Sequence, residues 1–465
     1  MVYIYYNTII GERKRKLHQR LAFPYEKFVT ESKPERSTIM KLEQALAAVK
    51  GEKAAELFME MYGADGVAAN VERYSHVAQG YVDTFGEGEF EFFTSPGRTE
   101  ISGNHTDHNL GKILAGSINL DCVAAAGLNN SNTVHIFSET YDQNITIDLA
   151  ELEPTKQKTG TVALLRGILK GFRRAGHEIG GFNAFVTSNV ISAAGVSSSA
   201  SFEMLICCIV DYLFNGDTLT VKDYAKIGQY AENAYWDKAS GLLDQMACAS
   251  GGVISIDFNT PDMDVENIDF SFNKIGYDLF IINTGKGHAD LSADYSSIPN
   301  EMKKVAAYFG KNVLAECSLE ELLANLSEVR AYAGDRAVMR AFHFFTENER
   351  VDTAVKALKE EDYDTFLQVI TESGNSSWKW LQNCYTISNY NEQSISIALA
   401  LTEMYLKKLG KGVCRVHGGG FAGVIMAVIP RENSAEFKEY MSSKMGADNV
   451  YVMNIRKYGS IHLAF

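Results

Sequence analysis

The chain has 465 residues, of which 46% are hydrophobic and 22% charged, a composition typical of globular proteins that excludes a mainly disordered chain. Its 44 basic and 58 acidic side chains give a net charge of −14, so we expect neither nucleic acid nor an anionic membrane as a partner. No apolar run reaches the roughly 18 residues that span a bilayer. The seven scattered cysteines contain no CxxC pair, so we expect neither a disulfide framework nor a zinc site. We expect a cytoplasmic protein, either a monomer or a weak homo-oligomer.

The patterned part of the chain begins at Met40, where apolar residues recur at helical spacing (MKLEQALAAVKGEKAAELFMEMYG). Residues 1–39 contain the basic run Arg13–Lys16, but no apolar segment follows it, so they are not a secretory signal. We expect them to be an N-terminal extension that is disordered or loosely packed.

Strand and helix patterns follow in a mixed order. Alternating or apolar runs predict strands at 87–95 (ending at Pro96–Gly97), 112–128, 135–140, 145–149, 182–190, 253–258, 277–285, 423–430, 451–455 and 460–465. Helical patterns cover 162–175, with Gly176 as a stop, 200–214 and a long stretch from about 300 to 381. Because strands and helices do not alternate strictly, we expect an α+β architecture with two lobes, residues 40–255 and 256–465, and the active site between them.

A run of small hydroxyl residues (GVSSSAS, 195–201) lies between a predicted strand and a predicted helix. Small residues let backbone N–H groups approach a phosphate, and the following helix N-terminus adds partial positive charge. No Gly-Lys-Ser/Thr follows, so this is not a Walker loop. The plainer alternative is a serine-rich helix cap. The candidate nucleotide-binding residues are Gly195, Ser197, Ser198, Ser199 and Ala200.

Three further segments carry polar or glycine-rich patterns. PGRTEISGNHTDHN (96–109) places an arginine, histidines and an aspartate in a turn, where carboxylate oxygens suit sugar hydroxyls, although a polar hairpin is the plainer alternative. GLLDQM (241–246) follows Glu232, and this pair of carboxylates suits a substrate hydroxyl and Mg²⁺. GGGFAG (418–423) lets backbone approach a ligand. Each signal is weak alone.

Taken together and in this order, the segments resemble the GHMP kinase superfamily and, within it, the galactokinase family, from about Glu87 to the C-terminus. PGR…G-HTD-N resembles the family's sugar signature, GVSSSAS its phosphate loop, GLLDQ its catalytic segment and CRVHGGGFAG its third motif. HADLSADY (288–295) and RAFHFFTENER (340–350) resemble two intervening stretches.

The resemblance implies an ATP-dependent kinase that acts on the anomeric hydroxyl of galactose, with ATP and Mg²⁺. By position, Asp244 is the catalytic carboxylate, and Arg98 lies between it and the γ-phosphate. The resemblance also implies that Ser199 and Glu232 hold Mg²⁺. The sugar pocket is implied to contain Asn104, His105, Asp107 and Tyr295.

The chain departs from the family pattern at several positions. Asn104 stands where the family has a glutamate that accepts a hydrogen bond from the sugar's 6-hydroxyl, which predicts weaker discrimination at C6. Other departures are Ile191, Ala193, Thr161 and Ser373–Gly374. Two alternatives therefore stay open. One is a kinase for another galactose-like sugar, such as galacturonate, L-arabinose or N-acetylgalactosamine. The other is a non-catalytic sugar sensor, against which Arg98, Asp244 and the serine loop argue.

Overall fold

The computed structural model describes residues 40–155, 160–191, 195–236, 240–285 and 291–465. The expected extension, residues 1–39, lies outside this range. Residues 40–465 form one compact unit. Its longer helices are α2 (Leu42–Val49), α3 (Glu52–Tyr62), α4 (Val67–Phe85), α5 (Thr161–Ala175), α6 (Ser198–Val210), α7 (Val221–Tyr235), α8 (Leu243–Ser250), α9 (Ser292–Tyr308), α10 (Leu319–Ala324), α11 (Leu326–Ala333), α12 (Asp335–Lys359), α13 (Tyr363–Ser376), α14 (Ser394–Leu409) and α15 (Ser434–Met445). Its strands are β1 (Glu91–Ser102), β2 (Lys112–Leu128), β3 (Thr133–Ser138), β4 (Gln143–Asp148), β5 (Phe182–Ser188), β6 (Val253–Asp257), β7 (Asp264–Ile268), β8 (Tyr277–Asn283), β9 (Val413–His417), β10 (Val424–Pro430), β11 (Val450–Met453) and β12 (Ile461–Leu463).

Within the described residues, the strands form an eight-stranded and a four-stranded sheet. The larger sheet has the order β12-β1-β2-β5-β3-β4, with β6 pairing with β2 and β7 with β6. All of its pairs are antiparallel except β3 with β5. The smaller sheet has the order β11-β8-β10-β9 and is antiparallel throughout. Strands and helices are thus mixed without regular alternation, which confirms the predicted α+β class.

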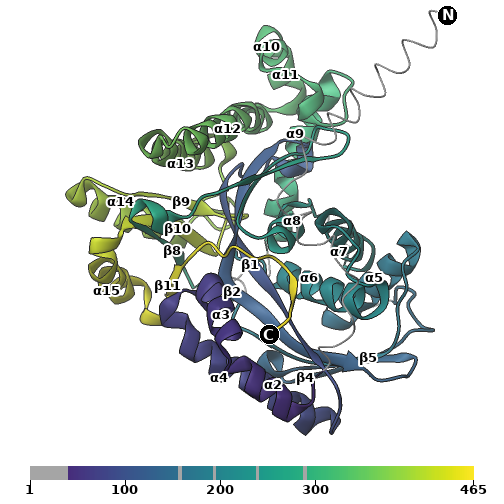
Figure 1. Cartoon of the computed structure of the whole chain (residues 1–465). Helices are drawn as coiled ribbons and strands as arrows, with labels where there is room; N and C mark the ends of the chain where they lie inside the picture. The colour runs from purple at the N-terminus through teal and green to yellow at the C-terminus, as the bar shows by residue number, and fades with distance from the viewer. Residues whose placement is uncertain (1–39, 156–159, 192–194, 237–239, 286–290) are drawn as a thin grey trace, which may run out of the picture. The chain divides into compact units, whose positions relative to one another are not determined.

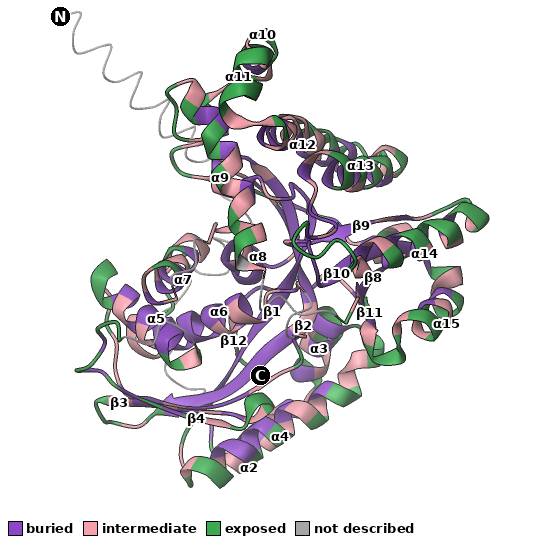
Figure 2. Ribbon diagram, turned by 180° about the vertical axis from the view of Figure 1, so that it is seen from behind, coloured by how far each residue is buried: buried purple, intermediate pink, exposed green. Residues whose placement is uncertain are grey.

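Both faces of the larger sheet are covered by helices, with α2–α4 on one side and α5–α8 on the other (Figure 1). Successive side chains on a strand point to opposite faces, so neighbours belong to different cores. Phe92 and Val123 pack with α2–α4, whereas Phe93 and Ala124 join the core beneath α5–α8. The long strands β1 and β2 are consequently buried on both faces (Figure 2). This enclosure makes them a rigid base for the polar groups they carry.

The smaller sheet is buried on both faces by the same alternation. Phe280 and Ile282 of β8 pack with α14 and α15, whereas Leu279 and Ile281 join the core that includes α13. A further core lies among α9, α11 and α12. The strand β9 from this sheet leads directly into the glycine-rich turn that reaches the site described below.

Two sequence predictions about these elements are wrong. The first strand does not end at Pro96–Gly97, because β1 continues to Ser102; its register against β2 shifts between Pro96 and Arg98, so an irregularity accommodates the proline. The long helical stretch is several helices, α9 to α13, broken at turns such as Gly334, whose φ is +95°. The helix that begins at Thr161 does stop at Gly176, in the left-handed conformation.

The division into lobes at residues 255 and 256 stays a prediction; that position lies inside β6, which pairs with β2 and β7. The last strand, β12, returns to the larger sheet beside β1. None of the helices in the described part of the chain is both long and apolar enough to cross a membrane.

Candidate active site

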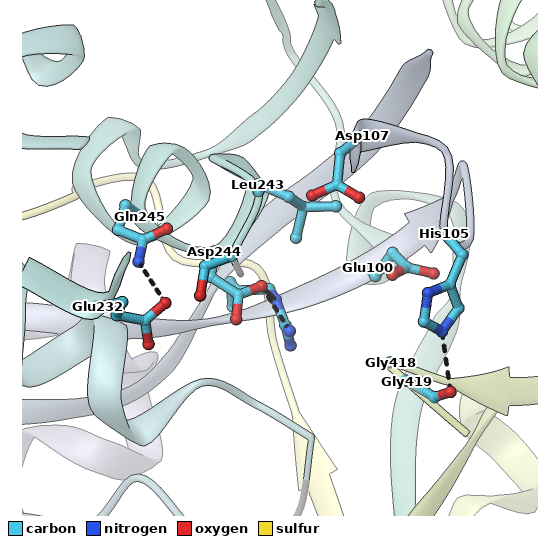
Figure 3. Close-up of a pocket in the computed structure, with 12 residues that line it drawn as sticks. Glu100, His105, Asp107, Glu232, Leu243, Asp244, Gln245, Gly418 and Gly419 are labelled. Carbon is cyan, nitrogen blue, oxygen red and sulfur yellow. Dashed lines mark hydrogen bonds and ion pairs between the residues drawn. The ribbon is translucent and has the colours of Figure 1, made fainter. Parts of the chain in front are cut away.

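A cavity of about 220 Å³ opens where β1, the polar turn after it, α7, α8 and the glycine-rich turn meet (Figure 3). This is smaller than the roughly 300–1,000 Å³ of sites for drug-sized ligands and therefore suits a small molecule. Its lining residues are Arg98, Glu100, His105, Asp107, Glu232, Ser240, Gly241, Leu243, Asp244, Gln245, Gly418 and Gly419. Five of the residues singled out from the sequence are among them, although they are up to 146 positions apart in the chain.

An ion pair between Arg98 on β1 and Asp244 in the first turn of α8 lies in this cavity. Arg98 Nε and Nη2 are 2.8 and 2.7 Å from Asp244 Oδ1. The arginine side chain is only 8% exposed and that of Asp244 31%, so the carboxylate is the partner that faces the cavity. Burial alone would lower the pKa of Arg98, but Asp244 and Glu100 raise it, so Arg98 stays a cation.

The serine-rich loop is joined to this ion pair. Arg98 Nη1 donates to the carbonyl of Gly195, and the backbone N–H of Arg98 donates to Val196 O at 3.1 Å. Gly97 permits this approach, because a Cβ there would come within 2.6 Å of Val196 O. Ser197 has φ +59°, and α6 begins at the next residue. A helix N-terminus carries partial positive charge and unsatisfied backbone N–H groups, a chemistry that suits an anion.

Glu232 on α7 lies beside Gln245 of α8, whose Nε2 donates to Glu232 Oε2 at 3.3 Å. Glu232 is 1% exposed. Two buried oxygens, Gln245 Oε1 and Ser197 Oγ of the serine-rich loop, have no hydrogen-bond partner among the described residues, which is rare for buried polar oxygens. Carboxylate and hydroxyl oxygens are the ligands that Mg²⁺ takes, so the residues present fit that ion.

The polar turn after β1 places His105 and Asp107 in the cavity. His105 Nε2 lies 2.9 Å from Gly419 O, so that nitrogen carries the proton, and burial lowers the pKa of the ring. Asp107 packs against Gly241, where a Cβ would come within 1.8 Å of its Oδ2. Burial first, and then the charges of Asp244 and Glu100, raise the pKa of Asp107 to about 7.

Two of the expected sugar-binding residues are placed differently. The side chain of Asn104 is fully buried and does not line the cavity. Tyr295 on α9 is also outside the lining; its hydroxyl donates to Gly420 O at 2.9 Å, so it supports the glycine-rich turn. His288, from the same stretch as Tyr295, lies outside the described residues. The loop residues 195–200 adjoin the ion pair but do not line the cavity.

Glu100 is a lining carboxylate without a predicted role, although it lies inside the motif at 96–109. It stands two residues after Arg98 on β1, and residues i and i+2 of a strand share a face. That spacing could have indicated Glu100, had β1 not been predicted to end before Arg98. Gln245 and the glycines 418 and 419 belonged to quoted motifs without a role of their own.

The fold is that of the GHMP kinases, a class of small-molecule kinases. The family model described as GHMP kinases N terminal domain matches residues 163–252, and the model described as galactokinase galactose-binding signature matches residues 79–128. A mevalonate kinase of Methanococcus jannaschii, 16% identical, shares the fold with a TM-score of 0.56 over 80% of this chain and 99% of its own.

The chain belongs to the galactokinase family. It is 30% identical to a galactokinase of Streptococcus suis over 369 residues, which cover 78% of this chain and 90% of the relative. A galactokinase of Lactococcus lactis subsp. lactis is 29% identical over 80% of this chain and 92% of its own. The crystal structure of the Lactococcus lactis galactokinase complexed with galactose has a TM-score of 0.73 and 28% identity, covering 84% of this chain and 99% of that one.

Proposed function

We propose that the protein phosphorylates galactose at its anomeric hydroxyl, with ATP as phosphoryl donor, to give galactose 1-phosphate. The observation that carries the proposal is the Arg98–Asp244 ion pair, which faces a small polar cavity on one side and the serine-rich loop on the other. Membership of the galactokinase family, and a relative solved with galactose, support this choice of sugar.

In the proposed reaction the anomeric oxygen attacks the γ-phosphorus, the bond from that phosphorus to the ADP oxygen breaks, and the hydroxyl proton leaves. Asp244, as an ionised acceptor, orients the hydroxyl and receives its proton. Arg98 keeps Asp244 ionised and stabilises negative charge on the transferring group. Its contact with Gly195 supports a position for that cation between the sugar side and the phosphate side. Most of the rate acceleration then comes from positioning and electrostatics.

The loop residues Gly195, Ser197, Ser198, Ser199 and Ala200 are proposed to hold the phosphates through backbone N–H groups and the α6 N-terminus. Ser199 and Glu232 would hold Mg²⁺, which when bound neutralises charge on the phosphates. On the sugar side, Asp107 accepts hydrogen bonds from ring hydroxyls and His105 closes the cavity against Gly419.

A panel assay tests the proposal against its alternatives. ADP release is measured with galactose, galacturonate, L-arabinose and N-acetylgalactosamine at equal concentrations. We expect the highest kcat/KM for galactose. A clear preference for another sugar would reassign the substrate, and tight galactose binding without ADP release would indicate a sensor. The expectations of a cytoplasmic location and of a monomer or weak homo-oligomer stay predictions.

A further inference from the structure

The galactose site proposed above contains Glu100, a carboxylate without a part in the reaction as described so far. Glu100 lies on β1 and lines the cavity together with Asp107 and Asp244. Figure 3 shows it beside His105 and the glycine-rich turn, whereas Asp244 and Glu232 lie on the other side of the view. With galactose in this cavity and its anomeric hydroxyl at Asp244, as proposed, Glu100 faces the part of the sugar that is turned away from the reacting hydroxyl.

The neighbouring Asn104 has no hydrogen-bonding capacity left for a ligand. Its Nδ2 donates to Glu100 Oε1 and to Gly418 O, both at 2.8 Å. Its Oδ1 accepts from Asn383 Nδ2 at 2.9 Å and from Ser377 Oγ at 3.3 Å. An amide can donate two hydrogen bonds and accept two, so all four are used within the protein. Asn104 thus holds Glu100 in place instead of contacting the sugar.

Glu100 is also held by Arg415 of β9. Arg415 Nη2 is 2.7 Å from Glu100 Oε1, and the arginine side chain is fully buried. Its other two nitrogens are also used: Nη1 donates to the carbonyl of Ile101 and Nε to that of Val416. The contacts of Glu100 with Asn104 and Arg415 both involve Oε1. None of the described residues donates a hydrogen bond to Oε2, and the 6% of the side chain that is exposed opens on the cavity. The arrangement pairs Glu100 with the guanidinium group of Arg415 through Oε1 and leaves Oε2 for a ligand.

We propose that Glu100 is the specificity-determining carboxylate of the sugar site. Its Oε2 accepts a hydrogen bond from a non-reacting hydroxyl of galactose on the His105 side of the ring. Its charge, added to those of Asp107 and Asp244, excludes sugars that carry a carboxylate there, such as galacturonate, because unpaired like charges in a closed site repel strongly. Glu100 therefore supplies the negative charge that the family's glutamate has at the position of Asn104. We expect the protein to retain discrimination against uronic acids for this reason.

The test combines Glu100→Gln with sugars that lack single hydroxyls. The kcat/KM values of wild type and variant are measured for galactose and for its 3-, 4- and 6-deoxy analogues. We expect the substitution to lower kcat/KM for galactose about 10- to 100-fold, since hydrogen bonds to charged groups are strong, and to change it little for the one analogue that lacks the bonded hydroxyl. We also expect galacturonate to gain relative to galactose in Glu100→Gln by a comparable factor.

Two further variants separate recognition from structure. Glu347→Gln removes a charge from another buried glutamate, which pairs with Arg350 at 2.7 Å outside the cavity lining, so its effect should be equal for every sugar. Glu100→Asp keeps a carboxylate beside Arg415 and serves as the second variant if Glu100→Gln does not fold. It should show the same hydroxyl-specific loss without any gain for galacturonate.

Calorimetric binding of galactose and the deoxy analogues gives a readout that does not need turnover. An equal loss for all sugars in Glu100→Gln, or no loss for any, would overturn the assignment of Glu100. If wild type phosphorylated no sugar at all, the proposed function would fail, while the binding pattern would still decide whether Glu100 contacts the sugar.

Discussion

Two arginine–aspartate clusters each include a residue of the paired strands β1 and β2, Arg98 in one and Asp121 in the other, and they differ in how completely the aspartate is enclosed. Asp121 of β2 is fully buried; its Oδ1 is 2.6 Å from Arg73 Nη1, and its Oδ2 is 2.5 Å from Arg456 Nη1. Tyr62 and Thr94 also donate to Oδ2, each at 2.6 Å. Asp244, in contrast, pairs with Arg98 and is 31% exposed. The first cluster is saturated by protein donors, and the second faces a cavity.

We infer that this difference separates a charge that stabilises the fold from one that takes part in the proposed reaction. The Asp121 cluster joins α3, α4, β1, β2 and the segment before β12, so it ties both ends of the described chain to the larger sheet. Burial would raise the pKa of Asp121, but Arg73 and Arg456 outweigh burial and lower it. Asp244 is only partly enclosed by protein and lines the cavity, which leaves room for a ligand group next to its carboxylate.

Removing the charge at the open site should have the largest effect on catalysis and almost none on stability. We expect Asp244→Asn to lower kcat about 10²–10⁴-fold, because it removes the acceptor and the partner of Arg98. Steady-state ADP release with galactose measures the loss, and thermal denaturation checks the fold. Asp269→Asn, at a side chain that is 94% exposed, is the control and should behave as wild type. Near-normal turnover in Asp244→Asn would refute its catalytic role.

Removing the charge at the closed site should have the opposite profile. We expect Asp121→Ala to destabilise the protein by about 3–5 kcal/mol, since two guanidinium groups lose their buried partner. The Tm should fall by several degrees, while kcat per folded molecule stays near that of wild type. Because the folded-state pKa of Asp121 is lowered, its contribution is present above its ordinary pKa and is lost as pH falls through the lowered value. A variant with an unchanged Tm would contradict the distinction.

The cavity carboxylates should give the sugar site a pH dependence near neutrality. The pKa of Asp107 is raised to about 7, so acid converts it to the neutral form, which accepts hydroxyl hydrogen bonds less well. We expect kcat/KM for galactose to fall about tenfold from about pH 8 to about pH 6, and this fall to be absent in Asp107→Asn. A flat wild-type profile over this range, with the Tm unchanged, would show that Asp107 titrates elsewhere.

The smallest effect is expected from the N-terminal extension. Residues 1–39 precede the helical pattern and lie outside the resemblance to the family. A chain that starts at Met40 should match the full chain in Tm and in kcat/KM, because Met40 itself begins the packed part by bridging to Phe90. A large loss in either measurement would assign the extension a structural or functional part.

Much of the fold could be predicted because its patterns are local. Strand β2 has the predicted bounds, 112–128, since a continuous apolar run is typical of a strand buried on both faces. The sequence predicts too early an end for β1, because proline and glycine usually end strands. The irregularity that accommodates Pro96 and Gly97 depends on pairing with β2 and is not a local pattern. The proposed catalytic pair, Arg98 and Asp244, could be named through the family motifs. The contact between the two residues spans 146 positions and follows from no local pattern.

The remaining site residues depend on tertiary hydrogen bonds that a motif does not encode. Asn104 occupies a position that the resemblance assigns to the sugar, yet Glu100 and three partners from distant parts of the chain use all four of its hydrogen bonds. Glu100 faces the cavity because Arg415 and Asn104 hold its other oxygen. These contacts join the segments 100–104, 377–383 and 415–418, so they can be recognised only once the fold brings the three segments together.

The position of the phosphate in the product tests the central claim most directly. Wild type and Asp244→Asn are incubated with ATP and galactose, and the product is assigned by ³¹P and ¹³C NMR with phosphorus–carbon coupling. We expect wild type to place the phosphate on the anomeric oxygen and to form one product for each ADP released, and Asp244→Asn to form almost none in the same time. Phosphate on the 6-hydroxyl, or equal amounts of product from both proteins, would contradict the assignment of Asp244 and Arg98 to the anomeric hydroxyl.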